Sequence, residues 1–454
     1  MATTSWADLS LRVPSSTVGS MKDRRVLALC LALLAAACTS SSQTASNPAP
    51  SAAPPVTPSV GSPPVTPTVS SLPYSATRVS IKPPQDGSFL VRGLYPKSQS
   101  SCKHAHRGTI EARYPGTVSV RSADDGTMSI VLTLPFERYL EGIAEVPPSW
   151  PAAALEAQAV AARSYALDHI GWTGQQGETL QKPICATTDC QVYGGIPVPP
   201  TPGFRRWTAA VERTAGQVLL YGDRPADTVY FSTSNGHTYG NDQVFGSDPL
   251  PYLRPVVERD DGASPTSHWR VTLPFADLAT FLRAGGVWPD GARISSVRRT
   301  GSSVRVAGPG TSKTMDAGAF RDTVNAWASC LMPARYPTDA LPTTIPSDWY
   351  DASSGSHGAT VAGRGWGHGV GLVQWGAYGK AKRGWSADRI LAFYYGGLRP
   401  TPYPEPGLIH VVVASGLQTL TVRPSASGAS VGGLSLGRGT LRLTGDAGVV
   451  TVDQ

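Results

Sequence analysis

A single glutamate in a proline-rich loop is the strongest candidate in this sequence for acid–base chemistry. Glu145 opens the loop 145–151, which leads into an alanine-rich segment. The prolines restrict the loop, and a carboxyl against an aromatic wall such as Trp150 has a raised pKa and can act as an acid near neutral pH. The N-terminus of a following helix favours the anion instead. Spacing alone therefore leaves two readings open, a catalytic acid and a solvated loop carboxylate.

Two further segments have compositions that suit contact with sugars. Residues 230–238 carry hydroxyl groups, an amide and an imidazole at the end of a predicted strand. Residues 363–379 have glycine at nearly every second position, around His368, which lets the backbone approach a ligand closely. The aromatic residues of this second segment that could stack on sugar faces are Trp366, Trp375 and Tyr378. A polar turn and a structural histidine are the alternatives that composition leaves open.

Several other functional motifs are missing from the sequence. No Gly-Lys-Ser/Thr follows the glycine-rich segment, so it is not a Walker phosphate loop. Its spacing does not fit a dinucleotide-binding fingerprint, and the chain contains no His-Glu-x-x-His zinc helix. Nucleotide binding and zinc-protease activity are therefore unsupported.

The cysteines predict disulfides and leave a metal site as the alternative. Four cysteines follow Cys38, and an exported chain favours disulfides. We expect a local Cys185–Cys190 clip and a long-range Cys102–Cys330 link. Zinc bound by Cys102, His104, His106 and the Cys185/Cys190 pair is the other reading, but no recognised zinc-finger spacing is present. We therefore expect neither a metal nor a cofactor.

The elements that must position these segments mix helices and strands. The clearest helix is predicted over 152–168, with Ser149 as its cap, and a second over 388–395. Short apolar runs between turn residues predict strands at 118–120, 129–134, 217–221, 228–232 and 270–273, and later at 409–413, 417–422, 441–443 and 449–452. We expect a β-rich α+β fold. Residues 406–454 are either a small C-terminal β segment or the end of the main sheet.

Composition excludes several protein classes. The chain has 454 residues, enough for two or three domains, with 48 Gly and 40 Pro that predict many turns. No coiled-coil or collagen period appears, and one apolar stretch is too few for a multi-span membrane protein. The net charge of +7 is mild and no Lys/Arg run exceeds two residues, which argues against nucleic acid as a partner.

The first 77 residues predict export and a tether. A charged run from Met21, the apolar stretch 26–37 and Cys38 form a signal peptide, so residues 1–38 are a leader with its start at Met21. The end of the leader resembles a bacterial lipobox, which would place lipid on Cys38 and anchor the chain to the cytoplasmic membrane. An ordinary signal peptide cut nearby is the alternative. Residues 39–77 have no charged residue and predict a disordered linker.

Taken together, the three chemistry-bearing segments resemble the SpoIID/LytB family of stage II sporulation protein D and amidase-enhancer proteins. The matching stretches, in the family's order, are 139–167, 185–195, 232–253, 363–379 and 394–397. The resemblance covers roughly residues 110–400. It implies a SpoIID-like domain over 78–405 with a long substrate groove, and work on peptidoglycan in the cell wall.

The resemblance also implies a reaction, the lytic cleavage of glycan strands between N-acetylmuramic acid and N-acetylglucosamine. Glu145 takes the place of the family's catalytic glutamate in a Glu-Met-Pro motif, with Val146 replacing Met and Glu141 as the fallback. One carboxyl can protonate the leaving oxygen and then take the proton of the C6 hydroxyl that closes a 1,6-anhydro ring. A hydrolase normally needs two carboxylates. The residues expected to orient the glycan are Arg163, Ser234, His237, His368 and Gln374.

A non-catalytic function is the alternative. The amidase-enhancer branch of the family suggests a wall binder that stimulates an N-acetylmuramoyl-L-alanine amidase. Peptidoglycan is the expected partner for both functions, and an amidase is a further partner if the protein is a wall binder. Contact with the membrane is expected only through the N-terminal lipid anchor.

Overall fold

The computed structural model describes residues 71–84, 87–95, 109–175, 182–197, 200–337 and 344–454. The predicted leader, the lipid site at Cys38 and nearly all of the linker lie outside these residues.

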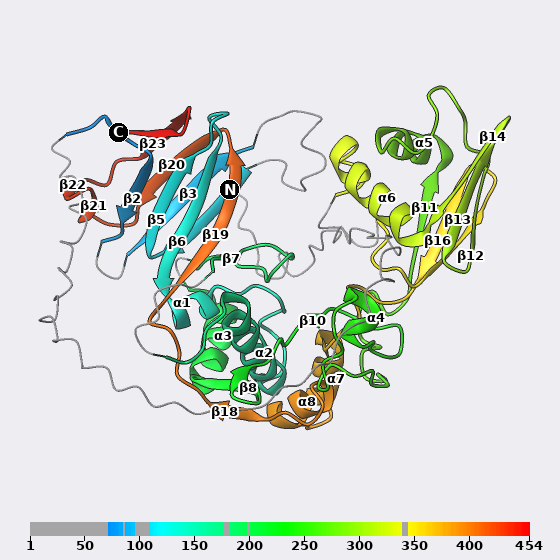
Figure 1. The fold of residues 1–454 in the computed structure, drawn as a ribbon, viewed down its shortest axis with the longest axis horizontal. Helices are drawn as coiled ribbons and strands as arrows, with labels where there is room; N and C mark the ends of the chain where they lie inside the picture. The colour runs from blue at the N-terminus through cyan, green and yellow to red at the C-terminus, as the bar shows by residue number, and fades with distance from the viewer. Residues whose placement is uncertain (1–70, 85–86, 96–108, 176–181, 198–199, 338–343) are drawn as a thin grey trace, which may run out of the picture. The chain divides into compact units, whose positions relative to one another are not determined.

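Two large sheets combine strands from the beginning and the end of the described chain (Figure 1). The seven-stranded sheet has the order β22 (Leu434–Leu436), β21 (Ala429–Val431), β2 (Arg78–Lys82), β5 (Thr117–Ser122), β6 (Met128–Pro135), β19 (Leu408–Leu417) and β7 (Ile184–Cys185). The six-stranded sheet has the order β1 (Tyr74–Ala76), β24 (Val449–Asp453), β23 (Leu441–Asp446), β20 (Thr419–Pro424), β3 (Ser88–Leu94) and β4 (Thr109–Pro115).

The apolar faces of these two sheets belong to one core. The strand β6 alternates buried and part-buried residues, so Ile130 and Leu132 are fully buried together with Val91 and Val422 of the other sheet. This alternation is the period-2 pattern that the sequence analysis used, and it explains why β5, β6 and β19 were predicted close to their observed bounds.

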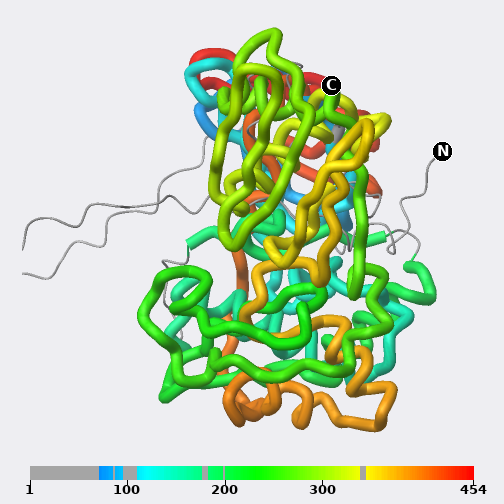
Figure 2. The backbone as a smooth tube through the Cα atoms, turned by 90° about the vertical axis from the view of Figure 1, so that its right-hand side faces the viewer, coloured from blue at the N-terminus to red at the C-terminus, as the bar shows by residue number. Residues whose placement is uncertain are grey.

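Between β6 and β19 the chain contains a mainly helical part of the fold. It contains α1 (Phe136–Glu141), α2 (Ala152–Ile170), α3 (Pro202–Arg213), α4 (Asn241–Phe245), α7 (Gln374–Lys382) and α8 (Ala387–Tyr394). A small sheet of β18 (Pro400–Pro402), β8 (Gln217–Tyr221) and β9 (Arg224–Pro225) accompanies it, together with the parallel pair β10 (Tyr230–Phe231) and β17 (Leu372–Val373). The segments that contain β10 and α7 run side by side in the lower part of Figures 1 and 2.

The helix α2 is buried on nearly every side. Thirteen of its nineteen residues are buried, and six of these are alanines, which let neighbouring elements approach closely. Gly171 ends the helix in the left-handed conformation, with φ of 75°, where glycine is favoured. The loop 145–151 leads directly into this buried helix, so α2 fixes the position of Glu145.

Residues 269–363 form an inserted module with a core of its own. The module contains β11 (Trp269–Pro274), α5 (Phe275–Ala284), β12 (Ser296–Thr300), β13 (Ser303–Gly308), β14 (Thr311–Asp316), α6 (Ala317–Leu331), β15 (Tyr350–Ser354) and β16 (Gly358–Gly363). Its strands make the sheets β11-β16-β15 and β12-β13-β14, drawn in green and yellow in the upper part of Figure 2. The sequence analysis did not separate this module from the rest of residues 78–405.

The α+β, β-rich fold class is confirmed, and two local expectations need correction. Ser149 does not cap α2, because the N-cap residue is Pro151, which makes no side-chain hydrogen bond there. The strand predicted over 228–232 shortens to Tyr230–Phe231, since Val229 accepts hydrogen bonds from Leu372 and Tyr395 instead. Of the two readings of residues 406–454, strand pairing favours the end of the main sheet, because β19 pairs with β6.

Candidate functional site

The carboxyl of Glu145 meets groups from three distant parts of the chain. Its Oε1 accepts a hydrogen bond from the backbone N–H of Val192 at 2.5 Å. The side chains of Gln374 and Tyr230 lie near enough to the carboxyl to stabilise its anion by hydrogen bonding. Glu145 is nevertheless part-exposed, so one side of the carboxyl remains accessible. The candidate site therefore forms where the loop after α1, the loop after β7, β10 and the start of α7 converge.

The surroundings of Glu145 raise its pKa to about 7. Burial is the main cause, because it penalises the charged form, and the donors Val192, Gln374 and Tyr230 partly oppose it by stabilising the anion. The carboxyl is therefore divided between its protonated and ionised forms near neutral pH, as general acid–base chemistry requires. Trp150 was expected to lie beside this carboxyl. Its ring packs against the rings of Trp375 and Tyr378.

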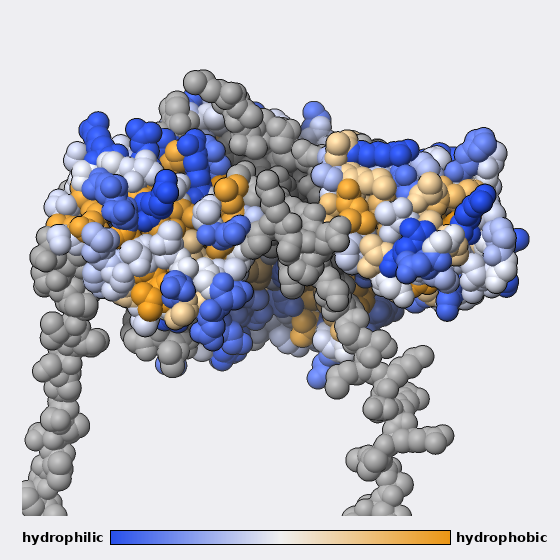
Figure 3. All heavy atoms as spheres, turned by 90° about the horizontal axis from the view of Figure 1, so that it is seen from above, coloured by the Kyte–Doolittle hydropathy of each residue, from blue (hydrophilic) through white to orange (hydrophobic). Residues whose placement is uncertain are grey.

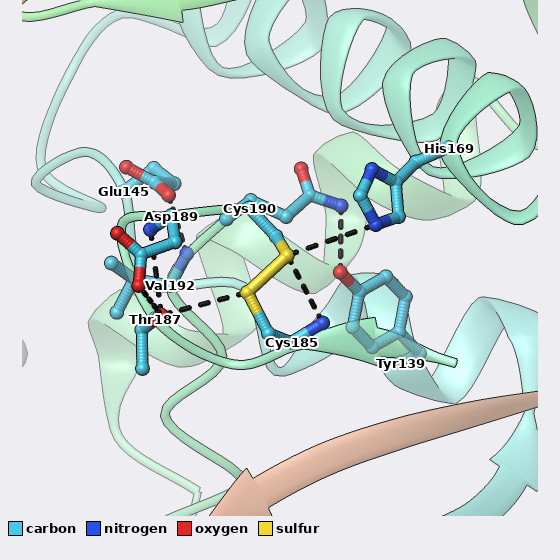
Figure 4. Close-up of a disulfide and its surroundings, with 9 residues drawn as sticks. Tyr139, Glu145, His169, Cys185, Thr187, Asp189, Cys190 and Val192 are labelled. Carbon is cyan, nitrogen blue, oxygen red and sulfur yellow. Dashed lines mark hydrogen bonds between the residues drawn. A yellow bond between two sulfur atoms is a disulfide. The ribbon is translucent and has the colours of Figure 1, made fainter. Parts of the chain in front are cut away.

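A disulfide stabilises the loop that binds Glu145. Cys185 and Cys190 are bonded as predicted, with their Cα atoms 5.5 Å apart (Figure 4). In Figure 4, Glu145 and Val192 lie to one side of the disulfide, and His169 and Tyr139 lie to the other. Because both sulfurs are used in the bond, they are not thiolate ligands for zinc in this state. Cys102, His104 and His106, and with them the predicted Cys102–Cys330 link, fall outside or partly outside the described residues.

Tyr230 is the functional candidate that sequence reasoning missed. Its hydroxyl donates to Gln191 Oε1 at 2.8 Å as well as lying within hydrogen-bond reach of Glu145. The amide of Gln191 is buried and in turn donates to the hydroxyl of Tyr139 at 2.7 Å. Tyr230 begins the polar segment 230–238, which was the available signal, but its role depends on contacts that are not local in sequence.

Two of the predicted glycan-orienting residues lie at this site: His368 contacts Tyr230, and Gln374 contacts Glu145. His368 Nδ1 accepts from the N–H of Val370 at 3.1 Å, so Nε2 carries the proton and donates to the carbonyl of Tyr230 at 2.9 Å. Burial lowers the pKa of His368 to about 4, which keeps the ring neutral. Gln374 lies near enough to the Glu145 carboxyl to stabilise its anion, and its Nε2 is 3.5 Å from that residue's backbone oxygen.

Ser234 and His237, which were also predicted to orient the glycan, make their contacts away from Glu145. Ser234 is buried, and both its N–H and its hydroxyl donate to Asp261 Oδ2, at 2.8 and 2.7 Å. The ring of His237 lies 4.4 Å from that of Tyr239, and its Nδ1 is 3.0 Å from the carbonyl of Thr238. These contacts order the segment after Tyr230 and do not reach Glu145.

Arg163 and Glu141 have ion-pair partners of their own. The guanidinium of Arg163 is fully buried, with Nη2 2.9 Å from Glu137 and Nε 2.7 Å from Glu405. A buried, paired arginine cannot orient a glycan, so its position indicates a structural role that ties α2 to residue 405. Glu141 pairs with Arg138 one helical turn away.

The sequence is similar to one protein family and to several known proteins. The sequence profile of the family described as Stage II sporulation protein, SpoIID, matches residues 124–221. An uncharacterized protein of Brachyspira hyodysenteriae is 30% identical over 282 residues, which cover 61% of this chain and 69% of that protein. Stage II sporulation protein D of Bacillus subtilis is 28% identical over 66% of this chain and 84% of its own length. The Amidase enhancer of the same organism is 29% identical over 57% of this chain and 39% of its own length.

The chain belongs to the SpoIID/LytB family, a cell-wall-related family. The stretch matched by the family profile contains α1, Glu145, α2 and the disulfide loop. Among the described residues no helix is both long and apolar enough to span a membrane.

Proposed function

We propose that this protein is a peptidoglycan lytic transglycosylase in which Glu145 is the single acid and base. The observation that carries the proposal is the part-exposed Glu145 carboxyl, with its pKa raised to about 7 and three hydrogen-bond donors around it. In the described part of the chain these donors are a backbone N–H, an amide and a phenol, so no second carboxylate bonds to Glu145. One such carboxyl suits a reaction without water better than hydrolysis.

The proposed reaction breaks one bond and forms one without adding water. Protonated Glu145 donates to the oxygen that leaves C1 of N-acetylmuramic acid, and the C1–O bond breaks. The C6 hydroxyl of the same sugar attacks C1 while Glu145 takes its proton, which closes the 1,6-anhydro ring and restores the acid. Because the nucleophile is already attached to the substrate, proximity supplies much of the lowering of the barrier.

The Tyr230 hydroxyl can assist both the proton donation by Glu145 and the later proton uptake. When Glu145 is protonated, the Tyr230 hydroxyl donates to Gln191 Oε1. When Glu145 is ionised after the first transfer, the same hydroxyl can turn to donate to the carboxylate. The anion is therefore stabilised only while it exists, which lowers the free energy of the intermediate without holding the resting acid in its charged form.

The first experiment compares purified protein with its Glu145→Gln variant on soluble products from peptidoglycan. We expect wild-type products about 18 Da, one water, lighter than the hydrolytic ones, and none from the variant. Glu141→Gln is the matched control and should keep most of the activity, since Glu141 is paired with Arg138. Products at the hydrolytic mass would contradict the mechanism, and equal activity of Glu145→Gln would remove Glu145 from it.

A second candidate is a wall binder that stimulates an amidase, and the relative named Amidase enhancer favours it. If neither protein releases products but both bind peptidoglycan, this becomes the better proposal.

For both functions we propose that the protein lies outside the cytoplasm, with lipid on Cys38 and residues 39–77 as a tether. Metabolic labelling with a lipid precursor tests the anchor, and the label should be lost in the Cys38→Ser variant.

A further inference from the structure

A cleft of about 820 Å³ lies between the inserted module and the polar segment 230–238. Its lining includes Arg270, Arg299 and Arg364 together with Trp349 and Asn235. None of the contacts described for Glu145 uses these residues. The cleft is therefore a feature of the fold that the proposed catalytic chemistry leaves without a role.

Arg299 is held rigidly in this cleft with its charge unneutralised. Its Nε donates to the carbonyl of Gly301 at 2.9 Å, and its Nη1 donates to the carbonyls of Asp348 and Tyr350 at 2.7 Å each. Its Cζ also lies 4.3 Å from the centre of the Tyr350 ring. All these acceptors are uncharged, and they leave the N–H groups of Nη2 without a partner in the described protein. Such a guanidinium is prepared for a carboxylate ligand.

Two further arginines add positive charge at the rim. Arg270 and Arg364 are exposed, and within the described ranges neither forms an ion pair. The carboxylates of the cleft are Asp348, whose Oδ1 lies 3.9 Å from Arg321 outside it, and Asp351 on the neighbouring strand β15. Three arginines therefore face two aspartates, one of which already has a partner, and the excess charge favours an anion.

The remaining lining suits a ligand with polar and apolar parts. The ring of Trp349 stacks on Tyr239, with centroids 5.6 Å apart and planes at 15°, which fixes it as part of the wall. Asn235 donates through Nδ2 to the hydroxyl of Tyr239, while its buried Oδ1 has no partner among the described residues. A buried amide oxygen normally accepts a hydrogen bond, so an ordered water is expected there.

The cleft is close enough to Glu145 for one polymer to occupy both. Tyr230 contacts the Glu145 carboxyl, and Asn235 lines the cleft five residues later in the same segment. At no more than about 3.5 Å per residue, the two Cα atoms are at most about 17 Å apart. At this separation of the Tyr230 and Asn235 Cα atoms, a single glycan strand is long enough to contact both places.

We propose that this cleft binds carboxylate groups of the wall polymer and so extends the substrate site beyond Glu145. The proposal rests on the proposed function for the identity of the polymer. The carboxylates have two sources, the stem peptides or, on peptide-free strands, the lactyl groups of N-acetylmuramic acid. Both present the same chemistry to the arginines.

The test measures binding in the Glu145→Gln background, which prevents cleavage. The variant Arg270→Gln/Arg364→Gln is compared with Arg298→Gln/Arg305→Gln, which removes the same charge from exposed positions of β12 and β13 in the same module. Each protein is titrated at low salt with peptide-bearing glycan fragments, peptide-free fragments and chito-oligosaccharides of equal length. The last ligand has no carboxylate and is the neutral control.

We expect the cleft variant to bind carboxylate-bearing fragments roughly ten-fold more weakly and chito-oligosaccharides unchanged, with the control variant unaffected. A loss confined to peptide-bearing fragments identifies the stem peptide, and a loss with both identifies the lactyl group. Unchanged affinity in the cleft variant and also in Arg299→Gln, which removes the rigidly held guanidinium, or an equal loss for chito-oligosaccharides, overturns the proposal. The single variant Arg364→Gln replaces the double variant if thermal unfolding shows that the latter is damaged.

Failure of the proposed function is separable from failure of this inference. If wild-type protein releases no anhydro products but the cleft variant loses carboxylate-dependent binding, the transglycosylase proposal fails and the cleft proposal stands. If anhydro products form and the cleft variant binds like wild type, the opposite holds.

Discussion

Glu145 must give up a proton and then regain it in the proposed reaction, so its two charge states need similar free energies. Burial disfavours the anion, and the donors Val192, Gln374 and Tyr230 favour it. Neither effect alone would serve, because burial without donors would make the anion too costly, and donors without burial would leave the carboxyl ionised at neutral pH. The pKa of about 7 is the balance between them.

Replacing Tyr230 by Phe should shift the pH dependence of cleavage. The variant removes a donor to the Glu145 anion, so the pKa of Glu145 rises further and the acid persists to higher pH. We expect the basic limb of the pH–rate profile to move up by as much as about one unit, and kcat to fall. Tyr221→Phe, at an exposed aromatic residue in the β8–β9 hairpin, should leave the profile unchanged. An unmoved basic limb in Tyr230→Phe would exclude the proposed role.

At the scale of elements, α7 positions Gln374 by packing closely on a buried ion pair. Lys380 Nζ lies 2.8 and 2.9 Å from the two oxygens of Glu258, and the side chains of both are almost completely buried. A Cβ added at Gly376 would come within 2.1 Å of the Tyr394 hydroxyl and 2.5 Å of Glu258 Oε2. Glycine at this position therefore allows the helix to approach the pair.

Gly376→Ala should consequently damage both stability and activity. Overpacking of this kind costs about 1–3 kcal/mol, and displacement of α7 would move Gln374 away from Glu145. Denaturant unfolding and cleavage rates measure the two effects. Gly262→Ala is the control, since a Cβ there meets nothing within 4 Å. If both variants unfold at the same denaturant concentration, the close packing at Gly376 is not important for stability.

The elements were more predictable from sequence than the site. The 2-residue and 3.6-residue periods locate β6, β8, α2 and α8 to within a few residues, because burial of one face imposes the period directly. The partners of Glu145 are not fixed in this way. Val192 is 47 residues away and Gln374 is 229, and only tertiary packing brings them together. Arg163 was expected to orient the glycan, but its side chain is buried in ion pairs with Glu137 and Glu405. No local pattern in the sequence indicated this burial.

On the scale of the whole molecule, the last strands complete sheets that the first strands begin. Within β19, Ile409 and Val411 are fully buried against the main core, and β20 and β24 pair with β3 and β1. Removing residues 406–454 should therefore prevent folding, although the family profile matches only residues 124–221. Circular dichroism and solubility of the truncated chain test this. A soluble, cooperatively unfolding product would instead establish 78–405 as a domain.

The pairing of β1 with β24, in which Tyr74 lies opposite Val452, also sets the order of events when the chain is made. The N-terminal strands leave the ribosome long before their partners, and sheet edges without partners are prone to pair with other chains. The six-stranded sheet therefore cannot be completed until β24 has emerged, so the newly made chain stays incompletely paired until then. If the proposed leader directs export, in which a chain is threaded through a membrane N-terminus first, that delay keeps the chain in the unfolded form that threading requires.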